Sequence, residues 1–275
     1  MSMIGHVRIR GDKTRSEIEL VQQEAVALLR SREAAQVIIS DPPYGIAYHS
    51  NRRVGKNPHA PVTNDWNVQI GPFLTEAGRV LAAGGVLYLF TRYDVYPLWA
   101  ASIAPPLTLK NVIVWVKDNH SAGDLDGDFG NKHEFLLMIT KGRFKRRGHR
   151  WSNVWEFPRV TAKVMLHPTQ KPVELVQRAI ESSSDPGDLI IDPFCGSGTT
   201  GEAARNCGRR ALLGDVDPAM IKITKRRLGL RVEPDEPPPI PMPVNECPIF
   251  GVVPPDPSLW GVHPEDLAHA LRRSH

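Results

Sequence analysis

The chain has 275 residues, 41% of them hydrophobic, with 34 Lys and Arg against 30 Asp and Glu and a formal net charge of +4. This length can bury a sizeable core, and the mild basic excess is far from a polycationic composition. Signal-length and bilayer-spanning apolar runs are absent, and the three cysteines lack the spacing of a disulfide framework or a zinc site. We expect a cytoplasmic protein without a metal.

The first predicted elements form a βαβ unit whose second strand ends at two prolines. Strands are expected over 18–22 and 36–40, on either side of a helix over 24–32. "DPPY" follows directly, and two prolines fix two φ angles and remove two backbone donors. This predicts a stiff, exposed turn with free carbonyl acceptors, with Asp41 at the end of the strand and Tyr44 just beyond it. A proline-rich turn with a capping Asp is the alternative.

Further along the chain, strands and helices alternate, which predicts an α/β fold with a mostly parallel sheet and helices on both faces. A long polar loop is expected over 48–64. The expected elements after it are a helix over 70–83, a strand over 86–90, a helix within 94–104, strands over 108–117 and 133–142, a helix over 173–183, and a strand, turn, helix, strand and helix over 188–229. Residues 231–275 are predicted to be a proline-rich tail with a short terminal helix, so that the folded domain covers 1–230.

A glycine-rich segment resembles a nucleotide-binding turn. "IIDPFCGSGTT", residues 190–200, sets Gly196 and Gly198 between an apolar strand and a helical pattern, where backbone amides can approach a ligand closely. Asp215 ends the next predicted strand, seventeen residues after Gly198, where a carboxylate can accept hydrogen bonds from a ribose. No Gly-Lys-Ser/Thr follows, which disfavours a triphosphate site, and a simple tight turn is the alternative. Residues 193–198 are called the Gly-rich turn below.

"SDPPYG", "HPTQKP" (167–172) and "DPFCGSGTT", in this order, resemble the β class of amino-methylating DNA methyltransferases, which use S-adenosylmethionine. The resemblance runs from about residue 18 to residue 230. It implies a Rossmann-like methyltransferase fold with circularly permuted motif order, and a bacterial, archaeal or phage origin. The chain departs from the family pattern at Gln23-Glu24, at Leu213 and at Met220, and the proline-rich tail has no counterpart.

The resemblance assigns roles to individual residues. The implied catalytic residues are Asp41, Pro42, Pro43 and Tyr44. The implied cofactor-binding residues are Asp192, Pro193, Phe194, Cys195, Gly196, Ser197, Gly198, Asp215, Thr169 and Lys171. For Thr169 a helix-capping role is the alternative, and Asp192 either contacts the cofactor or orients the turn.

The implied reaction is methyl transfer to the exocyclic N6 amine of a flipped-out adenine in double-stranded DNA. Two fixed acceptors, the Asp41 carboxylate and the Pro42 carbonyl, would take both amine hydrogens and free the nitrogen lone pair. Members with Asp before Pro-Pro-Tyr mostly methylate adenine, so cytosine N4 is the second candidate. An RNA amino-methyltransferase and a non-catalytic DNA-binding protein are further alternatives.

Two basic segments are candidate DNA contacts. Residues 141–151, called the basic cluster below, interleave Lys and Arg with Phe144 and Trp151, and a smaller group lies at 51–56. Target-recognition loops are expected at about 45–65 and 118–160. The candidate DNA-binding residues are Arg52, Arg53, Lys56, Arg143, Lys145, Arg146, Arg147 and Arg150. Solvated loops are the alternative, and a homodimer and a cognate restriction enzyme are further candidate partners.

Overall fold

The computed structural model describes residues 17–32, 34–44, 70–120, 127, 129–161, 163–167 and 169–230. The chain divides into units of residues 1–233 and 234–275, and every described residue belongs to the first. The expected loop over 48–64 and the proline-rich tail lie outside the described residues, so the expectations for both stay predictions.

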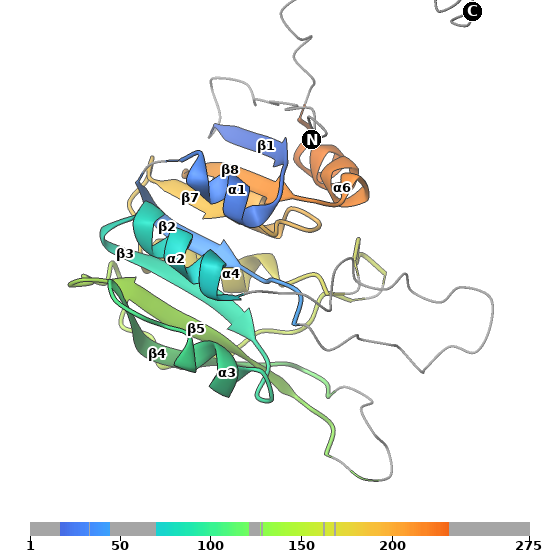
Figure 1. Cartoon of the computed structure of the whole chain (residues 1–275). Helices are drawn as coiled ribbons and strands as arrows, with labels where there is room; N and C mark the ends of the chain where they lie inside the picture. The colour runs from blue at the N-terminus through green and yellow to red at the C-terminus, as the bar shows by residue number, and fades with distance from the viewer. Residues whose placement is uncertain are drawn as a thin grey trace, which may run out of the picture. The chain divides into compact units, whose positions relative to one another are not determined.

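The described residues form an eight-stranded sheet (Figure 1). Its strands are β1 (Ile18–Gln22), β2 (Ala35–Ser40), β3 (Leu81–Thr91), β4 (Leu107–Val116), β5 (His133–Lys141), β6 (Val154–Glu156), β7 (Leu189–Asp192) and β8 (Arg210–Asp215). Their order across the sheet is β1-β8-β7-β2-β3-β5-β4-β6. All neighbours pair in parallel except β5, which runs antiparallel between β3 and β4. The predicted mostly parallel sheet is confirmed.

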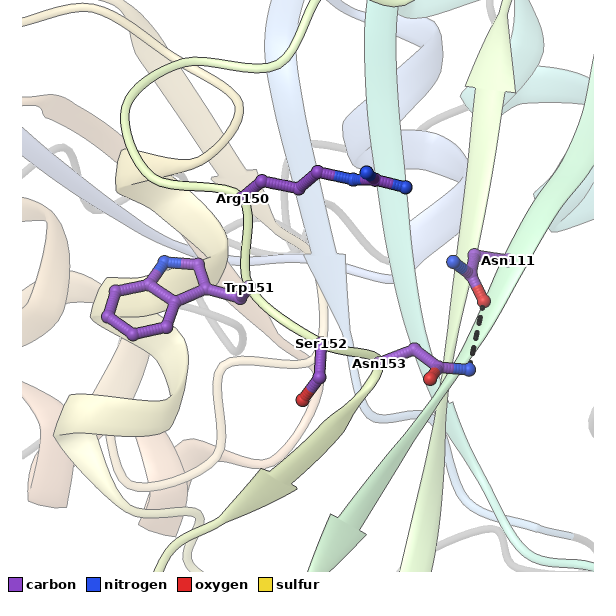
Figure 2. Close-up of a pocket in the computed structure, with 5 residues that line it drawn as sticks. All are labelled: Asn111, Arg150, Trp151, Ser152 and Asn153. Atoms are coloured by element: carbon purple, nitrogen blue, oxygen red, sulfur yellow. Dashed lines mark hydrogen bonds between the residues drawn. The ribbon is translucent and has the colours of Figure 1, made fainter.

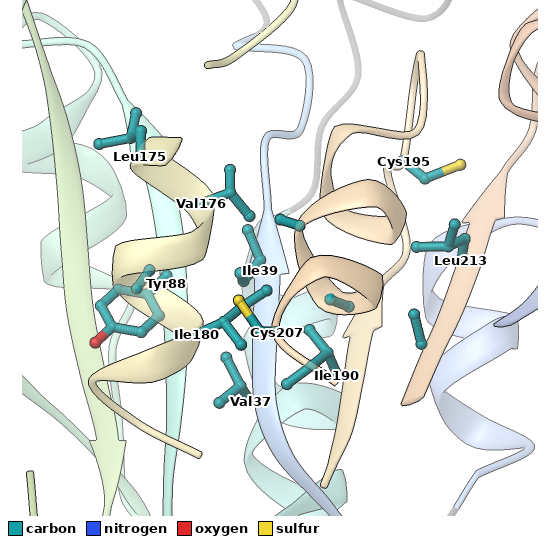
Figure 3. Packing of buried hydrophobic residues seen from close by; sticks show 14 of the residues in the cluster. Val37, Ile39, Tyr88, Leu175, Val176, Ile180, Ile190, Cys195, Cys207 and Leu213 are labelled. Carbon is teal, nitrogen blue, oxygen red and sulfur yellow. The ribbon is translucent and has the colours of Figure 1, made fainter. Parts of the chain in front are cut away.

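Helices cover both faces of this sheet. They are α1 (Ala25–Arg30), α2 (Ile70–Val80), α3 (Tyr96–Ala101), α4 (Val173–Glu181), α5 (Thr199–Asn206) and α6 (Pro218–Leu228). Buried side chains of α1, α2 and α3 join one apolar cluster with the sheet, and those of α4, α5 and α6 join a second one. Figure 3 shows the second cluster, where Val37 and Ile190 of the sheet meet Ile180 of α4. Burial of these aliphatic side chains on both faces explains why the central strands are almost continuously apolar.

Two elements differ from the sequence prediction. Helix α2 ends at Val80 rather than near residue 83, because Leu81 already pairs with Ala35 of β2 and begins β3. The three-residue strand β6, which pairs in parallel with β4, was not predicted, since its short segment carries no periodic pattern.

The topology creates a natural ligand site between β2 and β7. These strands lie side by side, with Ile38 opposite Ile191. From β2 the chain continues to β3 on one side, whereas from β7 it continues to β8 on the other. In open α/β sheets, ligands bind at the carboxyl ends of the strands where the connections diverge in this way. We call the edge at which these parallel strands end the carboxyl edge, and Asp41 and Asp192 both lie on it.

Candidate active site

The turn after β2 holds Asp41 and Tyr44 in direct contact. The Tyr44 hydroxyl donates a 2.8 Å hydrogen bond to Asp41 Oδ1, and its ring packs on Trp99 of α3 with centroids 5.8 Å apart. Burial and the adjacent charge of Asp41 raise the pKa of Tyr44 well above its ordinary value, so the phenol stays a donor. The prediction of an exposed turn is wrong: Pro42 is buried and Asp41, Pro43 and Tyr44 are half-buried, because α3 covers the turn through Trp99.

The other oxygen of Asp41 is paired with a buried lysine. Lys171 Nζ lies 2.7 Å from Asp41 Oδ2 and 3.1 Å from Glu134 Oε2, over the ring of Phe90 at 4.9 Å. Glu134 Oε1 in turn lies 2.6 Å from Lys117 Nζ. Burial alone would lower the pKa of Lys171, but the carboxylates of Asp41 and Glu134 outweigh it and raise this pKa above its ordinary value. Lys171 therefore remains an ammonium ion beside Asp41.

The Gly-rich turn connects β7 to α5 in the left-handed conformation that favours glycine. Gly196 has φ +48° and Gly198 has φ +82°. A Cβ atom at Gly198 would lie 2.8 Å from Thr224 Cγ2, whereas one at Gly196 would meet no described atom within 4 Å. Thr224 also donates a 2.7 Å hydrogen bond to the Gly196 carbonyl. Helix α6 thus supports the turn from behind and leaves space for a ligand at Gly196.

Side chains of the turn itself mostly face the protein. Pro193, Cys195 and Ser197 are buried, and the Phe194 ring packs edge-on against Phe73 with centroids 5.6 Å apart. The Cys195 amide donates a 2.8 Å hydrogen bond to the Gly214 carbonyl of β8. Burial raises the pKa of the Cys195 thiol well above its ordinary value, which does not suit a nucleophile. The turn would therefore contact a ligand mainly through its backbone.

Two further carboxylates lie on the carboxyl edge beside the Gly-rich turn. Asp192 is buried and accepts hydrogen bonds from the Phe194 amide and the Thr200 hydroxyl. Asp215 accepts 2.9 Å hydrogen bonds from the Gly196 and Asp217 amides. Burial raises the pKa of Asp192 to about 7, although its hydrogen bonds oppose this shift. Burial raises the pKa of Asp215 as well.

These carboxylate acceptors fit a cationic ligand that carries a ribose. Besides burial, the charges of Asp41 and Asp215 raise the pKa of Asp192, so an ionised Asp192 is repelled by both of these carboxylates. A ligand that carries a sulfonium and an ammonium would relieve this repulsion, and Asp215 at the end of β8 stands where a ribose-binding acid is expected. The residues present thus fit S-adenosylmethionine.

The remaining predicted residues are Thr169 and the candidate DNA contacts. Thr169 is exposed, and its hydroxyl lies 3.0 Å from His167 Nδ1. Arg52, Arg53 and Lys56 lie outside the described residues.

The basic cluster lies at the edge of the sheet opposite Asp41. Because β5 is antiparallel, it ends where β3 and β4 begin: Lys141 pairs with Leu107, and its Nζ donates a 2.7 Å hydrogen bond to the Leu81 carbonyl. The segment that follows lies at the left of Figure 1 and includes Arg143, Lys145, Arg146 and Arg147 in its sequence, whereas Arg150 lies further along, beside Asn111 of β4. Arg147 forms an ion pair with Asp185. This position argues against a contact with a duplex that presents a base to Asp41.

A cavity of about 530 Å³ lies at the end of the basic cluster (Figure 2), and it is lined by Asn111, Arg150, Trp151, Ser152 and Asn153. Arg178 of α4 stacks over the Trp151 ring at 4.4 Å, and His149 meets this ring edge-on at 4.4 Å. Trp151 thus contacts Arg178 and His149 of its own chain, while 48% of its surface stays exposed.

Sequence reasoning missed two charged residues of the site, Lys117 and Glu134. Both flank apolar strands, Lys117 just after β4 and Glu134 near the start of β5. A charged residue at the end of an otherwise apolar strand was the available signal. It did not reveal which of the many such residues face Asp41, because that depends on β5 being antiparallel.

Within the described residues, no helix is long and apolar enough to cross a membrane, and no group of three or more His, Cys, Asp or Glu could hold a metal ion. Cys195 and Cys207 are buried and free.

Comparison with known proteins identifies the family. The family model described as DNA methylase, which covers N6 and N4 methyltransferases, matches residues 35–226. The chain belongs to this DNA methylase family. The predicted class, a DNA methyltransferase that uses S-adenosylmethionine, is confirmed at this level.

Two relatives have named activities. The chain is 29% identical to the DNA adenine methyltransferase YhdJ of Escherichia coli K12, over 77% of this chain and 82% of that protein. It is 28% identical to the type II methyltransferase M.HpaI of Haemophilus parainfluenzae, over 76% of this chain and 73% of that protein. The similarity thus extends over most of both relatives.

Solved structures support the predicted Rossmann-like methyltransferase fold. The complex of M1.HpyAVI with S-adenosylmethionine aligns with a TM-score of 0.59 at 23% identity, over 77% of this chain and 100% of that chain. The cytosine-N4-specific PvuII DNA methyltransferase aligns with a TM-score of 0.61 at 13% identity, over 81% and 90%. The permuted motif order remains a prediction from the sequence.

Proposed function

We propose that this DNA methylase transfers a methyl group from S-adenosylmethionine to the exocyclic N6 amine of adenine in double-stranded DNA. The observation that carries the proposal is the location of Asp41 at the divergence of β2 and β7, beside the Gly-rich turn. Direct methyl transfer needs an acceptor for the amine hydrogens and a turn that binds the cofactor, and the two must lie at neighbouring strand ends.

Asp41 and Pro42 are the proposed acceptors for the two amine hydrogens. The amine of adenine is a poor nucleophile because its lone pair is delocalised into the ring. Two fixed acceptors draw the nitrogen toward tetrahedral geometry and free the lone pair. Tyr44 and Lys171 already fix the two oxygens of Asp41, so the carboxylate is oriented before the substrate arrives. Pro43 keeps the turn rigid.

The target base must leave the duplex to reach these acceptors. Flipping a nucleotide costs a few kcal/mol, which stacking and hydrogen bonding in the pocket offset. Tyr44 is the proposed stacking partner, because Trp99 supports its ring from the protein side. The larger purine gains more from this stacking than cytosine does.

The cofactor supplies an electrophilic methyl group on a sulfonium. We assign the ribose hydroxyls to Asp215, the ammonium to Asp192, and the methionine part to the backbone of the Gly-rich turn. Support for this assignment comes from the repulsion among the carboxylates of the carboxyl edge, which a cation relieves. Thr169 and Lys171 remain candidates for the cofactor carboxylate, although the ammonium of Lys171 already contacts Asp41 and Glu134.

Adenine is favoured over cytosine by the Asp before Pro-Pro-Tyr and by the relative named as an adenine methyltransferase. Cytosine N4 is the second candidate, favoured by the fold similarity to the PvuII enzyme. Both amines are conjugated with a ring nitrogen, so the acceptors serve either base.

The test is direct. The purified chain is incubated with duplex DNA and S-adenosylmethionine carrying a tritiated methyl group, and the DNA is digested to nucleosides for mass spectrometry. We expect N6-methyldeoxyadenosine, and none with Asp41→Ala. N4-methyldeoxycytidine instead would establish the second candidate, and transfer to RNA in a parallel competition would move the activity to RNA. Absence of transfer to any nucleic acid would leave a non-catalytic binding protein.

A homodimer, a restriction partner, and DNA contacts from Arg52, Arg53 and Lys56 stay predictions from the sequence.

A further inference from the structure

Four side chains of alternating charge form a chain of ion pairs that ends at Asp41. Lys117, Glu134, Lys171 and Asp41 follow one another at 2.6, 3.1 and 2.7 Å. Their side chains are 14%, 18%, 10% and 23% exposed in the same order. Charges this close and this poorly hydrated interact strongly. A change at Glu134 would therefore be transmitted to Asp41 through Lys171.

Glu134 occupies this position because of the antiparallel strand β5. The strand begins at the carboxyl edge, so that its second residue faces the site. Glu134 Oε2 is buried and receives no hydrogen bond of good geometry from the described part of the chain, which leaves the ammonium of Lys171 as its neighbouring charge. Burial alone would raise the pKa of Glu134, but Lys171 and Lys117 lower it to about 2. Glu134 is therefore ionised at every physiological pH.

Lys171 needs a second carboxylate if Asp41 is to act on an amine. The ammonium lies against the Phe90 ring and is nearly excluded from water, where an uncompensated charge is costly. If Asp41 were the sole counter-ion, it would have to neutralise Lys171 and accept an amine hydrogen at once. The full charge of the ammonium would then weaken the acceptor oxygen. Glu134 shares this task and leaves Asp41 electron-rich.

We propose that Glu134 is a positioning residue for methyl transfer, which holds the Lys171 ammonium so that the Asp41 carboxylate is fixed and remains a strong acceptor. The inference rests on the proposed function, because it is there that Asp41 acts on an amine. Lys117 holds Glu134 from the other side through Oε1.

Three variants separate this role from a structural one. Glu134→Gln keeps the shape and removes the charge, and we expect kcat to fall about 10- to 100-fold, the size of effect that a misplaced reacting group causes. The dissociation constant of S-adenosylmethionine should stay within about twofold, because Glu134 contacts none of the groups assigned to the ribose, the ammonium and the methionine part of the cofactor. Glu134→Asp keeps the charge and should recover part of the lost kcat.

Glu19→Gln is the matched control. Glu19 lies on β1, is paired with Arg32 at 2.7 Å, and has a side chain 20% exposed, but it is at the far end of the sheet order from β5. This variant should retain the wild-type kcat. An unchanged kcat in Glu134→Gln, or weakened cofactor binding with kcat intact, would overturn the inference while the proposed function stands.

A double-variant cycle tests whether Glu134 acts through Lys171. In a Lys171→Met background, Glu134→Gln should lower kcat by less than about a further threefold, because the lysine through which Glu134 acts is missing. Fully additive losses would assign Glu134 a separate structural role and contradict the inference.

A measurement without DNA or cofactor makes the inference independent of activity. In protein with ¹³C-labelled lysine, the Lys171 ε-methylene signal is assigned by its disappearance in Lys171→Met. Asp41 and Glu134 are the charged groups that contact the ammonium, with Tyr44 and Lys117 one contact further away. The wild-type signal should stay constant from about pH 8 to 10.5, and in Glu134→Gln it should titrate within that range.

If the Lys171 signal titrated identically in wild type and Glu134→Gln, the inference would be wrong, whatever the methyltransferase activity of the two proteins. A wild-type chain that transfers no methyl group but shows the expected titration difference would overturn the proposed function, and would leave Glu134 as the residue that holds Lys171 and Asp41.

Discussion

The backbone amide of Gly196 donates a 2.9 Å hydrogen bond to Oδ2 of Asp215. This contact ties the Gly-rich turn to the end of β8, and the Asp217 amide holds the other oxygen of the same carboxylate at 2.9 Å. A carboxylate has about four lone-pair sites, so Asp215 keeps acceptor capacity for a ligand. Asp215 therefore shapes the turn, and it offers the acceptor that we propose for the ribose of the cofactor.

Asp215→Ala should weaken cofactor binding. Loss of charge-assisted hydrogen bonds to the ribose corresponds to about 1 to 3 kcal/mol, or roughly 5- to 150-fold in the dissociation constant of S-adenosylmethionine. Calorimetric titration measures the constant directly. Asp215→Asn keeps one carbonyl acceptor and should lose less. Cofactor affinity equal to wild type in Asp215→Ala would remove Asp215 from the proposed site.

Asp41→Ala should have the opposite profile. Methyl transfer should fall at least about 100- to 1000-fold, as for other groups that act on developing charge, while the cofactor still binds within about threefold. Radioactive methyl incorporation gives the first quantity and calorimetry the second. If the variant failed to bind S-adenosylmethionine, Asp41 would belong to the cofactor site instead.

Cofactor affinity should depend on pH through Asp192. Burial raises the pKa of this carboxyl to about 7, so it is half protonated near neutral pH in the free protein. A cation binds the ionised form, and affinity should therefore fall by up to about tenfold for each pH unit below 7 and level off above pH 8. Asp192→Asn should remove the part of the profile centred near pH 7. A wild-type affinity constant from pH 5 to 8 would contradict this assignment.

The raised pKa of Asp192 also determines the direction in which the free energy of unfolding changes with pH. Between about pH 4 and 7 the folded chain binds more protons at Asp192 than the unfolded chain does, so this residue makes the free energy of unfolding decrease as pH rises through that window. Urea unfolding of wild type and Asp192→Asn across the window checks the sign.

Neutralising the basic cluster should leave DNA binding largely intact. Because the first part of the cluster lies opposite the carboxyl edge, changing Arg143, Lys145 and Arg146 together to Gln should alter the slope of log affinity against log salt by less than about one unit. Arg147 is left in place because it pairs with Asp185. A slope smaller by about three units would show that the cluster contacts DNA.

Gly201→Ala should destabilise the chain. A Cβ atom at this position of α5 would lie 2.6 Å from Leu213 Cδ1 and 2.7 Å from Leu228 Cδ1, and such overpacking costs about 1 to 3 kcal/mol. Gly71 in α2 is the control, since its added Cβ meets no described atom within 4 Å and alanine favours helices by up to about 1 kcal/mol. Thermal unfolding should show a lower midpoint for the first variant only.

The sequence predicted the strands, turns and helix of the site, but it did not predict the ion pairs between the charged residues of the site. The strand before Asp41 and the strand, turn and helix around Gly196 follow from local patterns, because apolar runs, prolines and glycines act within a few residues. The pairing of Lys171 with Asp41 and Glu134 joins three distant segments. No local pattern encodes such a contact, which depends on strand order and direction.

The location of the basic cluster illustrates the same limit. Its composition suggested phosphate contacts, but composition does not reveal at which end of a strand a segment emerges. A single antiparallel strand, β5, carries Lys141 and the segment that follows it, as far as Arg147 beside Asp185, to the edge opposite Asp41.

The hairpin of β4 and β5 also makes the segment between them exchangeable. Val116 pairs with His133, and the Lys117 amide donates a 2.8 Å hydrogen bond to the Lys132 carbonyl, so both ends of the connection are fixed at the carboxyl edge. Residues between these anchors can change in number without shifting the register of any strand. We expect grafts from other methylases to be accepted here if Lys117 and Glu134 are kept. The predicted target-recognition segment could then diversify by insertion and deletion while the chemistry of the site is inherited unchanged.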